Sequence, residues 1–182
     1  MKTEQKSIML HEMEFVLRSP DPGDGEEFLA LRKAASEQTE FLIRYPEEIK
    51  GTAKEYAEML QRVKDSEEEI FIAAFDKGRM AGCVEIRKTG EQFKYRHRAG
   101  LGIALRKEYW NLGLGTELIR MVLQEIRKTR FRQIELGVFA ENAGAVHVYK
   151  KLGFEEWGKH PRAFQLKDGT FHDEIQMLLE LS

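Results

Sequence analysis

The sequence predicts a mixed α/β fold with a central, mostly antiparallel sheet of about seven strands and about four helices. Short apolar runs separated by turn residues indicate a meander of strands in the middle of the chain. Segments with apolar residues at helical spacing lie before and after that meander. One strand–helix–strand unit interrupts the otherwise antiparallel order, so the class is mixed α/β rather than doubly wound.

The N-terminal part of the chain predicts a strand followed by two helices. The strand "EFVLRS" ends at "PDPGDG", where two prolines and two glycines indicate a turn. An amphipathic helix is predicted over 26–37, with acidic residues in its first turn. A second helix is predicted over 52–65, because Thr52 and Glu55 have the spacing of a capping box.

Three strands of the meander come next. The apolar runs "EIFIAAFD" and "RMAGCVEIRK" are joined by Lys77 and Gly78, which predicts a β-hairpin. The stretch "YRHRAGLGIAL" predicts a long third strand, whose apolar face is expected to begin at His97.

The rest of the chain predicts two helices and three strands. Leu118, Val122 and Ile126 mark the buried face of the first helix, and "QIELGVF" predicts a buried strand after it. A short helix is predicted over 143–152, with Gly153 as the residue that ends it. A closing hairpin is predicted for "FEEWGKHPRAFQL" and "TFHDEIQMLLEL" around "KDGT".

Composition limits the function classes. A chain of 182 residues suits one domain, and we expect a polar leader over 1–12 followed by a single domain over 13–182. The net charge of −2 argues against nucleic-acid or membrane-surface binding. One cysteine, Cys83, excludes an internal disulfide and a cysteine-cluster metal site, and it suits a reducing cytosol. We therefore expect a cytoplasmic protein without a metal.

The stretch "EYWNLGLGTELIR" places Gly113 and Gly115 directly before a predicted helix. Unpaired N–H groups and the positive end of the helix dipole make such a turn suitable for an anion. A tight strand-to-helix turn without a ligand is the alternative. No Lys-Thr or Lys-Ser follows, and no third glycine is present, so the turn is neither a Walker loop nor a dinucleotide fingerprint.

Two motifs that follow one another along the chain favour the ligand-binding interpretation of this turn. The strand "RHRAGLGIALRKEYW", the glycine turn, a helix, "IELGVF" and "ENAGAVHVYKKLGF" together resemble the GNAT superfamily of acyl-CoA-dependent N-acyltransferases. The resemblance runs from about Phe15 to Leu181 in element order and is sharpest from His97 to Phe154. It implies a sheet splayed between the fourth and fifth predicted strands, and an acyltransferase that uses acetyl-CoA as co-substrate.

The resemblance also assigns the coenzyme site. The pyrophosphate is expected at the glycine turn, and the pantetheine arm along the third meander strand, as an added strand would lie. The family usually has Arg or Gln three residues before the first glycine, where this chain has Trp110. The coenzyme-binding residues expected on this basis are Ile103, Ala104, Leu105, Trp110, Asn111, Leu112, Gly113, Leu114, Gly115, Thr116, Asn142, Ala145 and Tyr149.

The second motif supplies two of those side chains. Asn142 offers a donor and an acceptor to the pantetheine amides, or it caps the following helix. Tyr149 lies on the apolar stripe of that helix and by itself suggests a core aromatic residue. The resemblance implies that its hydroxyl protonates the departing thiolate. Gly137, in the preceding strand, would permit a local distortion, or it indicates tight packing.

A primary amine is mostly protonated at neutral pH, so the reaction needs a base or a less basic amine. The candidate bases on the central strands are Glu85 and His97. Alternatively, Glu85 is only a surface carboxylate and His97 only a structural histidine. Glu108 is expected to be solvated, and water relays could replace all three. Backbone N–H groups over 101–103 are expected to stabilise the oxyanion.

The acceptor is expected to be a small-molecule amine or a protein amino group. The loop "TEFLIRYPEEI" carries carboxylates that attract a cationic amine or are only solvated. The aromatic residues of this loop, together with Trp157 and Phe164, either line a substrate pocket or pack against the rest of the protein. A non-catalytic acyl-CoA-binding regulatory module and a nucleotide-binding fold are the competing functions. Oligomeric state stays open, with a homodimer through the C-terminal strands as one option.

Overall fold

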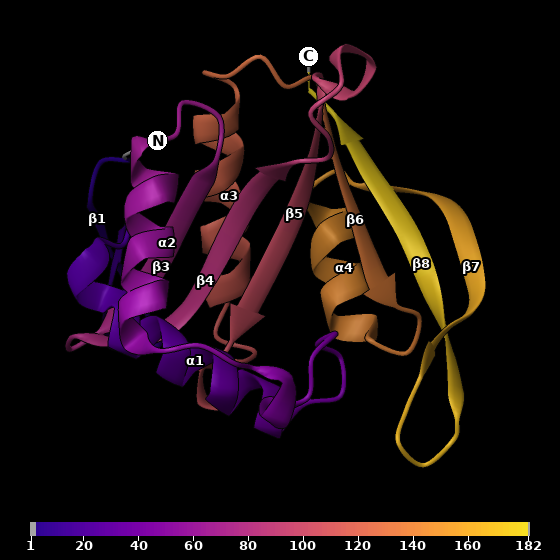
Figure 1. Ribbon diagram of the computed structural model, residues 1–182, viewed down its shortest axis with the longest axis horizontal. Helices are drawn as coiled ribbons and strands as arrows, with labels where there is room; N and C mark the ends of the chain where they lie inside the picture. The colour runs from indigo at the N-terminus through magenta and orange to yellow at the C-terminus, as the bar shows by residue number, and fades with distance from the viewer. Residues whose placement is uncertain (1–2, 182) are drawn as a thin grey trace. The chain divides into compact units, whose positions relative to one another are not determined.

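The computed structural model describes residues 3–181 and confirms the mixed α/β class (Figure 1). These residues form eight strands and four α-helices, and the strand order is β1-β2-β3-β4-β5-β6-β8-β7. The chain divides into two compact units, the first comprising 1–87 and 102–129, the second 88–101 and 130–182. Strand β5 (Arg98–Leu105) contributes to both. The single-domain organisation stays a prediction.

The first unit contains the β1-β2-β3-β4-β5 part of the strand order and three helices. Each strand from β1 to β4 pairs antiparallel with the next, although α1 and α2 separate β2 from β3 along the chain. Its elements are β1 (Lys6–Leu10), β2 (Met13–Arg18), α1 (Gly25–Gln38), α2 (Ala53–Asp65), β3 (Ile70–Asp76), β4 (Arg79–Lys88) and α3 (Leu114–Ile126).

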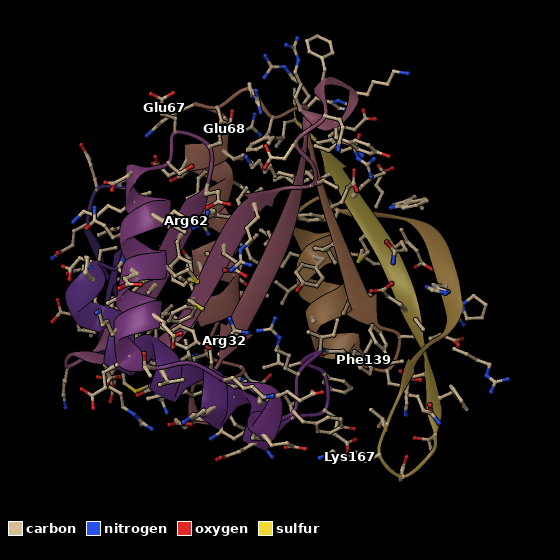
Figure 2. All side chains as sticks on the ribbon, viewed as in Figure 1. Arg32, Arg62, Glu67, Glu68, Phe139 and Lys167 are labelled. Carbon is tan, nitrogen blue, oxygen red and sulfur yellow. The ribbon has the colours of Figure 1, made fainter. Side chains whose placement is uncertain are left out.

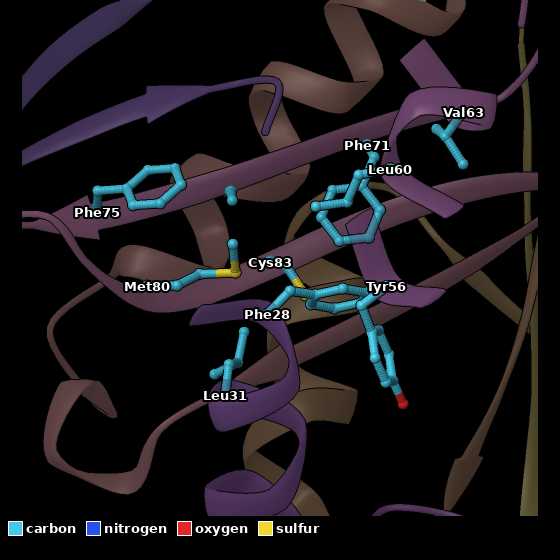
Figure 3. Packing of buried hydrophobic residues seen from close by; sticks show 10 residues of the cluster. Phe28, Leu31, Tyr56, Leu60, Val63, Phe71, Phe75, Met80 and Cys83 are labelled. Carbon is cyan, nitrogen blue, oxygen red and sulfur yellow. The ribbon is translucent and has the colours of Figure 1, made fainter. Parts of the chain in front are cut away.

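Helices α1 and α2 cover one face of β3 and β4, and α3 lies behind these strands (Figure 1). The Phe28 ring lies edge-on to those of Phe71 and Tyr56, with centroid distances of 4.9 and 5.3 Å. Figure 3 shows these rings beside Cys83 on the sheet. Such aromatic pairs add about 0.5–1.5 kcal/mol beyond the burial of their area.

Gly25 starts α1 at a point where α2 leaves no room for a side chain. A Cβ there would lie 2.6 Å from the Ala53 carbonyl oxygen and 2.8 Å from the Ala57 nitrogen. We expect Gly25→Ala to lower the free energy of unfolding by about 1–3 kcal/mol, because backbone atoms cannot give way as side chains do. Denaturant unfolding measures this, with Gly144→Ala as the matched control. Nothing lies within 4 Å of a Cβ at 144, inside a helix, so the control should be stabilised by about 1 kcal/mol or less.

The second unit contains the β5-β6-β8-β7 part of the order and one helix, α4 (Ala143–Lys151). The other elements are β6 (Gln133–Phe139), β7 (Glu155–Gln165) and β8 (Phe171–Glu180). Strand β8 pairs antiparallel with both β6 and β7. The α4 crossover therefore returns the chain to an edge strand, and β8 then inserts next to β6.

The fourth and fifth predicted strands, which are β5 and β6, form the parallel pair of the sheet. Their ladder joins Arg98 to Gln133 and ends where Gly100 pairs with Glu135. Strand β5 nevertheless continues to Leu105 and β6 to Phe139. The ladder thus stops partway along both strands, as the predicted splay requires.

The structure corrects the predicted elements near both ends of the meander. Residues Lys6–Leu10, predicted as part of a leader, form β1 against β2, so the sheet has eight strands rather than about seven. Backbone pairing rather than burial holds β1, since its side chains are mostly exposed. Met1 and Lys2, also in that predicted leader, lie outside the described residues. Strand β5 begins at Arg98, because a 3₁₀ turn occupies Phe93–Tyr95.

Local signals in the sequence are confirmed elsewhere. Thr52 accepts a hydrogen bond from the Glu55 N–H, and the Glu55 carboxylate accepts one from the Thr52 N–H, as a capping box requires. The β3–β4 hairpin turns through Lys77 and Gly78, both at positive φ. Gly153 follows α4 at φ +93°, a conformation that favours glycine.

Candidate active site

The glycine turn lies in the first unit, between β5 and α3. A 3₁₀ turn at Lys107–Tyr109 leads into it, and Asn111 and Gly113 have φ of 61° and 86°. Gly113 is the N-cap of α3, and a Cβ there would meet nothing within 4 Å. The glycine is therefore required by the left-handed backbone, and one side of the turn is open.

The start of α3 has free backbone donors. The Glu117 N–H donates to the Gly113 carbonyl, and no side chain caps the helix. The N–H groups of residues 114–116 precede that bond and have no intrahelical acceptor. By contrast, Thr52 caps α2 and Asn142 caps α4. The turn therefore retains what an anion needs, namely free donors at the positive end of a helix dipole.

The C-terminal end of β5 packs against this turn. A Cβ on Gly115 would lie 3.7 Å from side-chain carbons of Ile103 and Leu105, so the first turn of α3 packs on these two residues. The Trp110 indole N–H donates to the Leu105 carbonyl at 3.2 Å. The residue that departs from the family motif thus ties the turn to the strand. This link was not predicted, because nothing in the sequence pairs an indole with a carbonyl five residues earlier.

Helix α1 also holds this region in place. The Gln38 side-chain carbonyl accepts a hydrogen bond from the Lys107 N–H at 2.7 Å. The Gln38 amide reaches the Glu108 carboxylate, which lies 2.9 Å from the Arg79 guanidinium. A backbone hydrogen bond and the Arg79 charge hold the pKa of Glu108 below its ordinary value. Glu108 is accordingly a weak proton acceptor and has a structural role here.

Glu85 lies on β4 and faces the backbone of β5. A Cβ on Gly102 would lie 3.2 Å from a carboxylate oxygen of Glu85, so the glycine makes room for this side chain. The same carboxylate accepts a hydrogen bond from Arg87 at 2.6 Å, and its side chain is 25% exposed. Glu85 is thus a carboxylate with access to solvent, next to the strand segment that is expected to bind the thioester arm.

His97 does not lie where the sequence predicts. It precedes β5 in an exposed turn rather than beginning the apolar face of the strand. Its carbonyl accepts hydrogen bonds from the N–H groups of Arg132 and Gln133, at 2.8 and 3.2 Å. The observed contacts of His97 come from its backbone at the N-terminal end of β5, whereas Glu85 faces Gly102 in the C-terminal half of that strand. A catalytic role for the imidazole stays a prediction.

Asn142 and Tyr149 lie on α4 in the second unit. The Asn142 side-chain oxygen accepts a hydrogen bond from the Ala145 N–H at 3.2 Å, which confirms the capping interpretation and leaves the amide NH₂ group for a ligand. Tyr149 is 7% exposed and lies edge-on to Phe154, with ring centroids 5.8 Å apart. Burial raises the pKa of Tyr149 to about 12, so its hydroxyl keeps its proton at neutral pH.

Gly137, also in the second unit, serves close packing. A Cβ at this position would overlap the Glu174 carboxylate, which folds from β8 over β6. The Gln176 amide donates to the same carboxylate. The close approach of Glu174 explains the glycine at position 137, so a local distortion of the strand is not needed to account for it.

Some residues predicted to contact the acceptor have structural roles, and others lie exposed on the surface. Glu48 accepts a hydrogen bond from the Tyr45 N–H at 2.9 Å and so caps the turn at Pro46–Glu48. Phe164 stacks on Phe139 at 3.9 Å, whereas Trp157 is 59% exposed on β7.

Within residues 3–181, no group of three or more histidine, cysteine, aspartate or glutamate side chains is arranged to hold a metal ion. No helix in that range is both long and apolar enough to cross a membrane.

Comparison with known proteins identifies the class. Residues 30–154 match the model of the acetyltransferase (GNAT) family. An acetyltransferase of the GNAT family from Streptococcus pneumoniae superposes with a TM-score of 0.87 at 30% identity, over 92% of this chain and 99% of that one. The chain belongs to the GNAT family of acetyltransferases.

Curated relatives match shorter segments. The L-amino acid N-acetyltransferase AaaT of Escherichia coli K12 is 35% identical over 82 residues, which is 44% of this chain and 50% of that protein. The spermidine N(1)-acetyltransferase of the same strain is 28% identical over 120 residues, which is 65% of this chain and 62% of that protein. The matches thus span about half to three fifths of these relatives, whose named acceptors differ in charge.

Proposed function

We propose that this protein is an N-acetyltransferase that moves an acetyl group from acetyl-CoA to a primary amine by direct attack in a ternary complex. The observation that carries the proposal is the start of α3, where free N–H groups follow the left-handed Gly113. Family membership supports the same donor. Cytoplasmic location and a homodimer stay predictions.

The residues present fit acetyl-CoA. The N–H groups over 112–116 would hold the pyrophosphate, beside Trp110 and Asn111. The backbone over 103–105 would pair with the amides of the pantetheine arm, since the ladder between β5 and β6 has already ended at Gly100. On α4, the Asn142 amide NH₂ group would contribute a further polar contact, next to Ala145. Bound acetyl-CoA supplies the acetyl thioester.

Proton transfer is assigned to two side chains. Glu85 would take a proton from the ammonium form of the acceptor, directly or through one water, so that the free amine attacks the carbonyl carbon. N–H groups over 101–103 would stabilise the oxyanion while the C–N bond forms. The C–S bond then breaks, the Tyr149 hydroxyl would give its proton to the departing thiolate, and the nitrogen of the new amide would lose its second proton to solvent. Solvent returns a proton to Tyr149 and removes the one on Glu85.

Thiol release and coenzyme binding, measured on the same preparation, test the proposal against its competitors. We expect coenzyme A to raise the melting temperature and a panel of amines to trigger thiol release from acetyl-CoA. Protection by coenzyme A without turnover on any amine would instead support a regulatory acyl-CoA-binding module. Protection by ATP or NAD but not by coenzyme A would support a nucleotide-binding fold.

Adding a negative charge at the start of α3 tests the pyrophosphate position. We expect Thr116→Asp to weaken coenzyme A binding by at least about tenfold, because like charges at close range repel. The same substitution should leave the melting temperature unchanged or higher, since an acidic residue in the first turn favours a helix. Isothermal titration and thermal unfolding measure the two effects.

The matched control is Ala53→Asp, which adds the same charge to the first turn of α2, already capped by Thr52. It should not change coenzyme affinity. Unchanged affinity in Thr116→Asp would show that the turn binds no anion.

A further inference from the structure

Arg32 on α1 is a half-buried cation without a counter-charge. Within residues 3–181, its guanidinium forms neither an ion pair nor a hydrogen bond. Two other arginines have a carboxylate partner: Arg18 lies 2.6 Å from Asp24, and Arg62 lies 3.0 Å from Glu69. Figure 2 labels Arg32 beside α1 and Arg62 on α2. An unpaired cation that is partly removed from water loses hydration without compensation, which favours a role in binding an anion.

The surroundings of Arg32 place it on the face of the sheet that carries Glu85. Its guanidinium carbon lies 5.8 Å from the centroid of Phe28 and 5.9 Å from that of Tyr56. These rings pack over the sheet beside Cys83 (Figure 3). Burial chiefly raises the pKa of the Cys83 thiol; Glu85 raises it further and Arg32 opposes the rise. Cys83 and Glu85 are two residues apart on β4, so both side chains lie on the sheet face that Phe28 and Tyr56 cover.

We propose that Arg32 binds a carboxylate of the acceptor, and that the acceptor is an α-amino acid or a similar amine with an adjacent carboxylate. This inference rests on the proposed function, in which Glu85 receives the amine proton. A guanidinium can hold a carboxylate through two parallel hydrogen bonds, and the Phe28 and Tyr56 rings lie within about 6 Å of this one. An α-amino acid carries its amine and carboxylate on one carbon, so it presents a cation to Glu85 and an anion to Arg32.

Charge also argues against a polyamine at this place. Arg32 would repel a second ammonium group near Glu85, and Arg87 already pairs with that carboxylate. A half-buried cation without a counter-charge disfavours ligands that do not pair with it, so acceptors without a carboxylate should be poorer substrates.

The test compares three acceptors of the same shape, with acetyl-CoA and the full chain: L-leucine, L-leucinamide and isoamylamine. We expect kcat/KM to be at least about tenfold higher for L-leucine than for either other amine. The amide is less basic, so amine reactivity alone would favour the amide. A preference for the acid therefore reports recognition of the carboxylate.

Substitution of Arg32 separates recognition from folding. Arg32→Gln should lower kcat/KM for L-leucine by about 10- to 100-fold, mainly through KM, and should leave isoamylamine unchanged or improved. Arg32→Lys should recover part of the loss, because a point charge remains. The control Lys33→Gln removes an exposed charge from the same helix and should change nothing.

The outcomes distinguish the inference from the proposed function. Better turnover of isoamylamine than of L-leucine, or equal losses on all three acceptors in Arg32→Gln, would overturn the inference and leave acetyl transfer intact. Protection by coenzyme A without turnover on any amine would overturn the proposed function, and the inference with it. If Arg32→Gln unfolds, Arg32→Lys and the wild-type preference still decide the question.

Discussion

Replacing Tyr149 by Phe is expected to lower kcat by about 10²- to 10³-fold while coenzyme A affinity changes little. The hydroxyl is buried and protonated, so its removal deprives the departing thiolate of an acid but leaves the ring packed against Phe154. Single-turnover kinetics with acetyl-CoA and titration with coenzyme A measure the two quantities. Unchanged kcat would exclude Tyr149 as the acid.

A second buried tyrosine provides the control for this substitution. The Tyr109 hydroxyl donates to Asp76 at 3.0 Å, so Tyr109→Phe should lose about 1 kcal/mol of stability and keep its turnover. A comparable loss of turnover in both variants would indicate a general loss of structure.

The raised pKa of Tyr149 has a consequence for stability at alkaline pH. Tyrosine ionises near pH 10 in the unfolded chain but near pH 12 in the folded one, so the folded state holds the proton more tightly between these values. Stability from this group is complete below about pH 10 and is lost as the pH rises towards 12. The decrease in the free energy of unfolding over this pH range should be smaller in Tyr149→Phe.

Glu85→Gln is expected to lower kcat/KM for the acceptor by about 10²-fold at neutral pH, because the amide cannot take the ammonium proton. The defect should shrink as the pH approaches the amine pKa of about 10.4, where the free amine is already present. A pH profile of kcat/KM for both proteins measures this convergence. A constant ratio across the profile would contradict the assignment of Glu85 as the base.

The matched control for Glu85 is another carboxylate that is bound to an arginine. Glu69 lies 3.0 Å from Arg62, and its side chain is 10% exposed. Glu69→Gln removes a comparable ion pair just before strand β3, so it should keep both the rate and the shape of the pH profile.

Local signals in the sequence were enough to predict most of the fold. The capping box of Thr52 and Glu55, the Lys77–Gly78 turn and the stop at Gly153 each depend on residues near one another in the chain. Strand β1 escaped prediction because it is held mainly by pairing with β2, and only Ile8 and Leu10 are partly buried. His97 was placed in the strand because its spacing fits an alternation that the 3₁₀ turn at Phe93–Tyr95 interrupts.

The candidate site was predictable where backbone carries the chemistry. The glycine spacing before α3 indicates a helix start with free donors, and the structure has such a start. Contacts that individual side chains make with backbone elsewhere in the fold were not predictable. The Gly102–Glu85 and Trp110–Leu105 contacts depend on how β4, β5 and the turn meet. Arg32 follows the buried Leu31 in an amphipathic pattern, and sequence alone does not show that it lacks a counter-charge.

The most direct test of the central claim is product analysis by mass spectrometry after incubation with acetyl-CoA and an amine library. We expect N-acetylated amine and free coenzyme A in equal amounts, with both reduced together in Tyr149→Phe and in Glu85→Gln. Release of coenzyme A without an acetylated amine, or binding of coenzyme A with no product from any amine, would contradict it.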